Sequence, residues 1–181
     1  MKLLKTFKSS TKGFTLIELL IVIAILGVLA AGILVAIDPI EQLARGRDAG
    51  RKSVTTETGR AFQAYYTANA VYPTVAQWTN AAATNVMMMS GEIKVIPTQT
   101  ATTPATACTG GSLVNNFCYK VNLAGPDIIF YTHVDSKLEK NKGTCANVAA
   151  NTWYVYSSFD GRAGIVCQAA EPTAGQAYTF Y

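Results

Sequence analysis

The fold is decided near the N-terminus, where residues 12–37 are KGFTLIELLIVIAILGVLAAGILVAI. Nineteen consecutive residues without a charge extend from Leu19 to Ile37. A helix needs about 20 apolar residues to cross the hydrocarbon core of a bilayer, whereas the apolar part of a cleaved secretory signal has about 7 to 15. The length therefore favours a membrane anchor. The small residues Ala30, Ala31 and Gly32 allow the alternative of a signal-peptidase site.

The basic residues are concentrated before this apolar run. Lys2, Lys5, Lys8 and Lys12 precede Gly13, and the remaining eleven basic residues balance eleven acidic ones. The folded part therefore lacks the overall positive charge that is typical of nucleic-acid-binding proteins. Binding of nucleic acid stays possible, but no other feature of the sequence supports it. Because the lysines precede the span, we expect a cytoplasmic N-terminus and an exported remainder in an oxidising compartment.

Glu18 is an acidic residue inside the apolar segment. A carboxylate in a membrane helix is unfavourable unless it lies near the boundary or has a partner. One interpretation is that Glu18 caps the positive N-terminal end of the helix at the level of the headgroups. The other is that a charged partner neutralises it.

Residues 12–20, KGFTLIELL, and the apolar run after them resemble the class III leader and N-terminal helix of type IV prepilins and of the pseudopilins of type II secretion systems. The shared features are a short basic leader, Gly13 at the cleavage point, Phe14 as the first mature residue and Glu18 at the fifth mature position. The resemblance implies that a prepilin peptidase cuts after Gly13 and methylates the new amino group of Phe14. It also implies that Glu18 faces the Phe14 ammonium of a neighbouring subunit and sets the register of the packed helices.

A structural role in a filament follows from this resemblance. The implied partners are other copies of the chain or other pilins, the prepilin peptidase, an inner-membrane assembly platform and membrane lipid. Pilus and secretion pseudopilus are both compatible with these residues. The alternative is a singly membrane-anchored extracytoplasmic binding module or enzyme, which would need neither leader processing nor Glu18.

Motifs for catalysis or metal binding are absent from the sequence. It contains no G-x-S-x-G, P-loop, G-x-G-x-x-G or C-x-x-C pattern, and His133 is its single histidine. Asp160 followed by Gly161 supplies too few oxygen ligands for a calcium loop. We therefore expect a protein that is not an enzyme and has no cofactor or metal site.

Composition and patterning divide the 181 residues into four expected parts. With 50% apolar and 14% charged residues the chain is not disordered. The parts are a leader (1–13), a transmembrane and filament-core helix (14–37), an amphipathic half of the same helical spine (38–73) and a globular head (74–181). One helix from Phe14 to about Asn69 would be about 84 Å long. Gly27, Gly32 and Pro39 weaken it locally, and the resemblance implies loosening there in the filament.

The second half of the spine has a helical stripe of apolar residues, formed by Ile40, Leu43, Ala44, Val54, Thr58, Ala61, Phe62 and Tyr65. Arg47 and Arg51 interrupt this stripe. We therefore expect residues 40–53 to face neighbouring subunits or headgroups and packing on the chain's own sheet to begin near Val54. Asp48 should pair with Arg45, Arg51 or Lys52 at helical spacing.

Alternation of apolar and polar residues predicts an antiparallel sheet in the head. Strands are expected at residues 117–123, 128–134, 153–159 and 163–168, with a possible last strand at 177–181. Asp160 and Gly161 indicate a two-residue type I′ hairpin. Residues 74–115 are expected to form a short helix and loops. The predicted fold class is α+β, a pilin-like fold with four or five strands behind a long helix.

Cys108, Cys118, Cys145 and Cys167 permit three disulfide pairings. The sequential pairing, 108 with 118 and 145 with 167, is favoured because each bond then closes a short loop, which stabilises by about 3 kcal/mol for a loop of about 15 residues. In the resembling family a disulfide loop near the C-terminus often forms an exposed face, and Cys145 and Cys167 match it in position.

Overall fold

The computed structural model describes residues 13–79, 81–98, 106–143, 145 and 151–181. The expected leader, apart from Gly13, lies outside the described residues. The chain divides into two compact units, Met1–Pro39 and Ile40–Tyr181.

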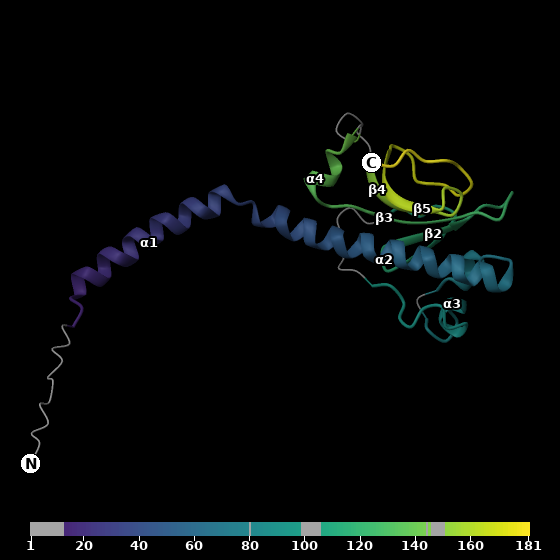
Figure 1. Cartoon of the computed structure of the whole chain (residues 1–181), viewed down its shortest axis with the longest axis horizontal. Helices are drawn as coiled ribbons and strands as arrows, with labels where there is room; N and C mark the ends of the chain where they lie inside the picture. The colour runs from purple at the N-terminus through teal and green to yellow at the C-terminus, as the bar shows by residue number, and fades with distance from the viewer. Residues whose placement is uncertain (1–12, 80, 99–105, 144, 146–150) are drawn as a thin grey trace, which may run out of the picture. The chain divides into compact units, whose positions relative to one another are not determined.

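The first unit contains helix α1, Leu16–Ala36 (Figure 1). α1 ends at Ile37, whose φ and ψ of −108° and 118° are those of extended backbone, and the next helix begins at Pro39. The expectation of one continuous helix from Phe14 to about Asn69 is therefore wrong. The physical reason is that a proline disfavours the helical conformation of the residue before it, here Asp38, while its own geometry suits the first position of a new helix.

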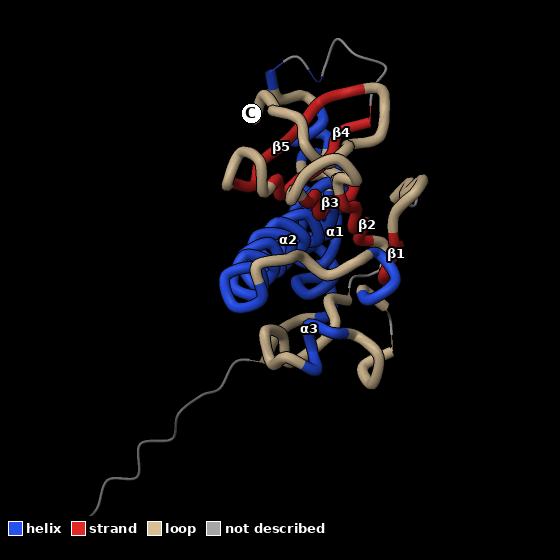
Figure 2. Tube along the Cα trace, turned by 90° about the vertical axis from the view of Figure 1, so that its right-hand side faces the viewer, coloured by secondary structure: helices blue, strands red, loops and turns tan. Residues whose placement is uncertain are grey.

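The second unit consists of helix α2, Pro39–Asn69, and an antiparallel sheet (Figure 2). The described residues form five strands in the order β1-β2-β3-β4-β5, so that each strand pairs with the next in the sequence. The strands are β1 Ser112–Val114, β2 Phe117–Val121, β3 Ile128–His133, β4 Asn151–Ser157 and β5 Arg162–Gln168. The predicted α+β class, with a pilin-like arrangement of N-terminal helix and small antiparallel sheet, is confirmed, except that the expected spine consists of two helices.

Two details of the predicted sheet are wrong. β1 lies in a segment expected to be loop, since its three residues are too short to show alternation, and it pairs with β2 through Leu113 and Cys118. The possible strand at 177–181 does not form. Tyr178 and Phe180 instead pack against the sheet as side chains, and the Tyr181 N–H donates to the Ile165 carbonyl at 3.0 Å.

The turn between β4 and β5 also differs from the expected two-residue hairpin. Ser157 pairs with Arg162, which leaves four residues in the connection. On its other edge β4 continues to pair with β3: the Ser158 N–H donates to the Ile128 carbonyl at 3.1 Å, and the Ser158 hydroxyl accepts from the Ile128 N–H at 2.7 Å. Gly161 has a φ of 65°, the left-handed conformation that glycine adopts without strain.

Both faces of the sheet are covered. On one face α2 contributes Phe62 and Tyr65 to a cluster with Tyr119, Phe130 and Tyr156. α2 approaches this face so closely at Gly59 that a Cβ atom there would overlap the Tyr156 ring. Burial of a large apolar side chain stabilises by about 1.5–3 kcal/mol, so this cluster holds α2 to the sheet.

The opposite face carries a second cluster, in which Cys118, Tyr131 and Trp153 lie under Tyr178. Short helices complete the head: η1 Val75–Gln77, α3 Val86–Met89 and α4 Lys137–Lys140. Met87 is buried in the α2-side cluster.

Candidate functional site

The N-terminal motif surrounds the first turn of α1. Gly13 and Phe14 precede the helix, and Phe14 is 80% exposed. Thr15 is the N-cap residue, and its hydroxyl accepts from the Glu18 backbone N–H at 3.3 Å. Glu18 Oε2 accepts in turn from the Thr15 N–H at 2.8 Å and from the Thr15 hydroxyl at 2.7 Å. These contacts form a capping box, so Glu18 has a partner within its own chain.

The sequence reasoning missed Thr15 as that partner. The signal was present, because Ser or Thr followed three residues later by Glu at the start of an apolar run is the pattern of a capping box. In the single chain Glu18 caps its own helix, as the first of the two interpretations predicted. The pairing of Glu18 with another subunit is not tested by the single chain and stays a prediction.

α1 presents apolar side chains on every side. Leu16 to Leu34 form a candidate membrane span of 19 residues with a mean hydropathy of 2.8, and the described large apolar side chains in it are 45% exposed or more. The helix runs through Gly27 and Gly32, and a Cβ atom at either glycine would meet open space. Loosening at Gly27, Gly32 and Pro39 concerns an assembled filament and stays a prediction. In the single chain the backbone leaves the helical conformation at Ile37, and Pro39 begins α2.

The N-terminal part of α2 is held to the head by carboxylates. Glu41 Oε2 accepts from the Lys137 backbone N–H at 3.0 Å, and Glu41 Oε1 accepts from the Leu138 N–H at 3.1 Å. The hydrogen bond from Lys137, with smaller effects of Leu138 and Arg45, holds the pKa of Glu41 below its usual value. Because Lys137 and Leu138 begin α4, Glu41 fixes that helix beside the first turn of α2.

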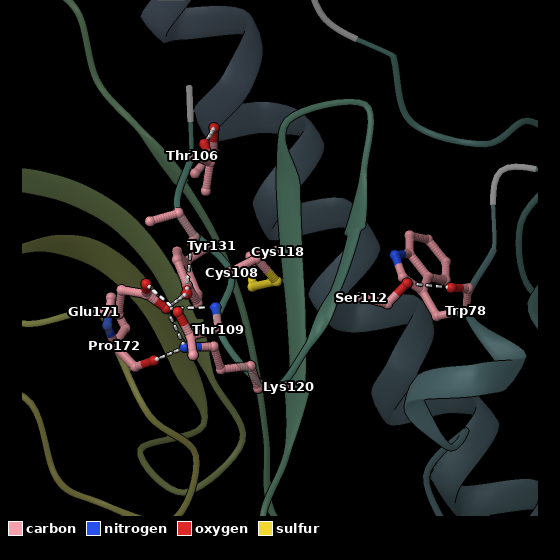
Figure 3. The surroundings of a disulfide bond; sticks show 12 residues. Trp78, Thr106, Cys108, Thr109, Ser112, Cys118, Lys120, Tyr131, Glu171 and Pro172 are labelled. Carbon is pink, nitrogen blue, oxygen red and sulfur yellow. Dashed lines mark hydrogen bonds and ion pairs between the residues drawn. A yellow bond between two sulfur atoms is a disulfide. The ribbon is translucent and has the colours of Figure 1, made fainter. Parts of the chain in front are cut away.

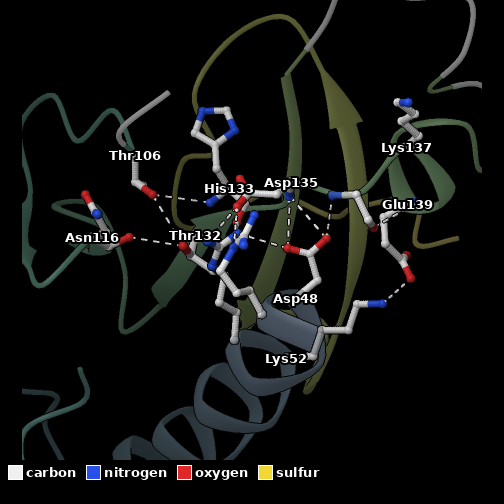
Figure 4. Close-up of polar contacts among 12 residues, drawn as sticks. Asp48, Lys52, Thr106, Asn116, Thr132, His133, Asp135, Lys137 and Glu139 are labelled. Atoms are coloured by element: carbon white, nitrogen blue, oxygen red, sulfur yellow. Dashed lines mark hydrogen bonds and ion pairs between the residues drawn. The ribbon is translucent and has the colours of Figure 1, made fainter. Parts of the chain in front are cut away.

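Two turns further along α2, Asp48 lies in a buried polar cluster with Asp135 of the segment after β3 (Figure 4). Arg51 belongs to the same cluster through its ion pair with Asp48. Asp48 accepts from the backbone N–H groups of Asp135 and Ser136, at 2.9 and 2.8 Å, and from Arg51 Nη1 at 2.9 Å. Arg51 donates further to Asp135 at 2.8 Å and to the His133 carbonyl at 3.3 Å. Although burial acts in the opposite direction, the guanidinium of Arg51 holds the pKa of Asp135 below its usual value.

Glu139 of α4 adds a group of three charges to this junction. It lies between Lys52 of α2 and Lys142, whose Nζ is 2.8 Å from Glu139 Oε2. Burial raises the pKa of Glu139, but the hydrogen bonds and charges of the two lysines outweigh it and lower the pKa below its usual value. The result is a carboxylate that stays ionised while nearly covered.

These contacts show that the buried side of residues 40–53 packs on the head of the same chain, and not on neighbouring subunits or headgroups as expected. Apolar packing of α2 on the sheet does begin near Val54, as expected. Glu41, Ala44, Asp48 and Arg51 are all buried in the head.

Arg51 interrupts the apolar stripe because the head offers it the His133 carbonyl and the Asp135 carboxylate as acceptors. Arg47 is exposed and contacts Asp135 from the surface. Of the expected partners of Asp48, Arg51 is the one that pairs with it.

The described cysteines form two disulfides, Cys108 with Cys118 and Cys145 with Cys167, which is the sequential pairing. Beside the first of them Glu171 ties the C-terminal segment to the sheet (Figure 3). Glu171 accepts from Lys120 Nζ at 2.7 Å and from the Thr109 N–H and hydroxyl, each at 2.8 Å. Burial alone would raise the pKa of Glu171, but these donors lower it to about 2.

His133 lies at the end of β3 and stacks on the Trp153 ring, with 3.7 Å between the ring centroids. Burial lowers the pKa of His133 to about 4, so the imidazole is neutral at physiological pH. Its surroundings are those of a packed core histidine. Within the described part of the chain, no group of three or more His, Cys, Asp or Glu side chains is arranged to hold a metal ion.

Comparison with known proteins identifies the N-terminal segment. Residues 8–34 match a family model described as the prokaryotic N-terminal methylation motif. Neither the curated proteins nor the solved structures contain a significant match to the chain. The match covers Gly13 and Phe14, the capping box and most of α1. The chain thus carries the methylation motif characteristic of type IV pilins and pseudopilins, and its apolar helix, second helix and antiparallel sheet make it a pilin-like protein of the kind that a prepilin peptidase processes.

Proposed function

We propose that this protein is a structural subunit of a type IV pilus or of a pilus-like filament such as the pseudopilus of type II secretion. The observation that carries the proposal is a single segment, residues 8–34, in which the methylation motif leads into an apolar helix containing Glu18. The head, in its described residues, has no group of three or more His, Cys, Asp or Glu side chains that could hold a metal ion. Its role in the proposal is to form the outer surface of the filament.

Processing after Gly13 would change the charge next to the helix. The Phe14 N–H becomes part of a terminal ammonium directly before the N-cap residue Thr15. A positive charge at the N-terminal end of a helix is unfavourable, because that end already carries the positive pole of the helix dipole. A carboxylate near Phe14 therefore stabilises the N-terminal end of the helix in the mature chain.

Glu18 can serve both its own helix and a neighbour. A carboxylate accepts up to about four hydrogen bonds, and the capping contacts of Glu18 with Thr15 use Oε2. The remaining acceptor capacity suits the Phe14 ammonium of another subunit. Among many nearly equivalent staggers of apolar helices, this one pair of charges would select the register, as a buried polar residue does in a coiled coil.

The exposed side chains of α1 fit two successive environments. In the membrane they would face lipid, with the N-terminus cytoplasmic and the head on the other side, where its disulfides form in an oxidising compartment. In the filament they would face the α1 helices of other subunits. An inner-membrane assembly platform and a separate motor would transfer the subunit from the first environment to the second.

Mass spectrometry of the mature N-terminus tests the processing step. We expect the chain to begin at Phe14 with a methylated amino group. An unprocessed chain would contradict the proposal and favour an anchored binding module or enzyme. A chain that begins at Ala31 or Gly32 would show an ordinary secretory signal instead.

Assembly is tested with Glu18→Gln, which keeps the size of the side chain and removes its charge. We expect normal cleavage but few or no filaments by electron microscopy. Glu57→Gln is the matched control, since Glu57 is an exposed glutamate of α2, and it should leave assembly unchanged. Thr15→Ala removes the cap while keeping the charge of Glu18, so equal loss of filaments in Thr15→Ala and Glu18→Gln would reduce Glu18 to a capping residue.

A further inference from the structure

The charges of the mature chain are divided between two regions. The first region, which we name the proximal face, comprises residues 40–52 of α2 and residues 135–142 around α4. It holds seven basic and four acidic residues, a net charge of +3, whereas the other residues from Phe14 onward sum to −3. The sequence separates the two halves of the proximal face, and the bonds of Glu41 to the Lys137 and Leu138 N–H groups bring them together.

The solvent-accessible surface of the proximal face is more basic than its net charge of +3 indicates, because its carboxylates are buried. The side chains of Arg45, Arg47 and Lys142 are 43%, 38% and 40% exposed, while the carboxylates with which they pair are 9%, 11% and 9% exposed. The fourth carboxylate, that of Asp48, is 2% exposed. Solvent therefore meets cationic groups, and the acids that balance them lie beneath.

Exposed aliphatic side chains lie among these cations. Ile40 and Leu43 of the first turns of α2 are 74% and 65% exposed, and Leu138 of α4 is 50% exposed. A surface that combines lysine and arginine with aliphatic side chains is typical of segments that lie in the headgroup region of an anionic bilayer.

The length of the chain keeps this face close to a membrane. Leu34 ends the candidate span, and Ile40 follows it six residues later, a distance of at most about 20 Å for an extended chain. The proximal face is thus confined near the bilayer whenever α1 is inserted, and such confinement favours even a weak contact.

We propose that the proximal face binds the anionic phospholipid surface of the membrane that holds α1, and so positions the head before assembly. The inference rests on the membrane anchor proposed above, and goes beyond it by giving the head itself a lipid contact. Anionic lipid fits better than nucleic acid because the aliphatic side chains would have no apolar partner on a phosphate backbone. The negative remainder of the chain would be repelled, which orients the head.

The test uses the full chain in vesicles of phosphatidylcholine alone or of phosphatidylcholine with a minority of phosphatidylglycerol. A water-soluble amine-reactive reagent labels the lysines, and mass spectrometry gives the labelling rate at Lys140 and Lys142 relative to Lys94, an exposed lysine outside the proximal face. We expect slowing of about fivefold or more in the anionic vesicles, and its reversal at high salt.

A charge reversal, Lys140→Glu, should restore fast labelling of Lys142 in anionic vesicles, and the matched control Lys94→Glu should not. Equal labelling in the two kinds of vesicle would overturn the proposal. Protection that follows the protein-to-lipid ratio in neutral vesicles would overturn it in favour of a second copy, and protection by an added oligonucleotide but not by anionic lipid would do so in favour of nucleic acid.

Flotation separates a failed anchor from a failed contact. A chain that floats with neutral vesicles but shows no difference in labelling has an anchor and no lipid contact of the head, which overturns this proposal alone. A chain that floats with anionic vesicles but not with neutral ones supports the lipid contact and contradicts the anchor. A chain that floats with neither contradicts both.

Discussion

Replacing Asp48 by alanine should be among the most destabilising changes in the head. The Asp48 carboxylate is 2% exposed and accepts from Arg51 and from the backbone N–H groups of Asp135 and Ser136. The variant leaves two backbone donors without their acceptor. It also leaves the Arg51 guanidinium, 1% exposed, with fewer anionic partners.

The magnitude follows from these losses. Breaking a buried ion pair by removing one member costs about 3–5 kcal/mol, since the other charge remains desolvated. Each buried donor left unsatisfied costs about 1–3 kcal/mol, although some will find water once the side chain is gone. We expect a loss of about 3–5 kcal/mol in the free energy of unfolding, or a fall of roughly 10 °C in Tm.

Urea unfolding of the full chain in detergent micelles measures this loss. Trp78 and Trp153 are both fully buried and report on the two faces of the sheet through their fluorescence. Glu57→Ala is the control, because Glu57 is an exposed acid of the same helix and should change stability by less than about 0.5 kcal/mol. The dependence of the unfolding free energy on urea should be the same in both variants if each still unfolds in one step.

The reasoning would be refuted if Asp48→Ala lost less than about 1 kcal/mol, since no buried pair of this kind is broken so cheaply. The double variant with Arg51→Met supplies a second test. Removing both charges should be less damaging than the sum of the two single changes, because neither charge is then buried alone. Strict additivity would show that Asp48 and Arg51 do not act as a pair.

Other predictions concern packing, pH and the disulfides. Gly59→Ala should cost about 1–3 kcal/mol by overlap with Tyr156, whereas Gly46→Ala, which meets open space in the same helix, should stabilise by about 0.5–1 kcal/mol; urea unfolding of the two variants checks this. On acidification the unfolded chain protonates His133 near pH 6.5 and the folded chain only near its pKa of about 4, so stability should fall between these values and His133→Gln should remove that fall. Glu171, with a pKa of about 2 against 4.5, should cause a further fall between about pH 4.5 and 2, seen in acid titration and weakened in Glu171→Gln. Reduction of the disulfides should lower the free energy of unfolding by about 2–5 kcal/mol for each bond, measured by comparing urea midpoints with and without reductant.

The general architecture could be predicted from the sequence because its signals are local. The apolar run that forms α1 and the alternation in β2 to β5 are properties of neighbouring residues, and they require no knowledge of the rest of the fold. The break between α1 and α2 was also encoded locally, in Asp38 and Pro39. β1 was not predictable in this way, since its three residues form a strand only because β2 offers an edge to them.

The contacts that hold α2 to the head could not be predicted, because they join residues more than 80 positions apart. Asp48 and Arg51 satisfy the pattern of a solvated ion pair at helical spacing equally well. What makes them a buried site is the backbone of Asp135 and Ser136, whose N–H groups face α2 after β3 ends. The hydrophobic pattern of α2 gives no information about its contact with the segment after β3, and the pattern of that segment gives none about α2.

The polar contacts also explain how a long helix keeps one position on the sheet. The apolar side chains of α2 recur each turn, so a shift by one turn, about 5.4 Å, would still place apolar residues over the sheet. Glu41, Asp48 and Arg51 do not tolerate such a shift, because each carboxylate or guanidinium would lose the backbone groups that it satisfies. The apolar cluster around Phe62 therefore stabilises the packing of α2 on the sheet, and the polar contacts near the start of α2 fix its position along the sheet. In the proposed filament this position would need to be unique, since a shift of α2 on the sheet would displace every contact that the head makes with neighbouring subunits.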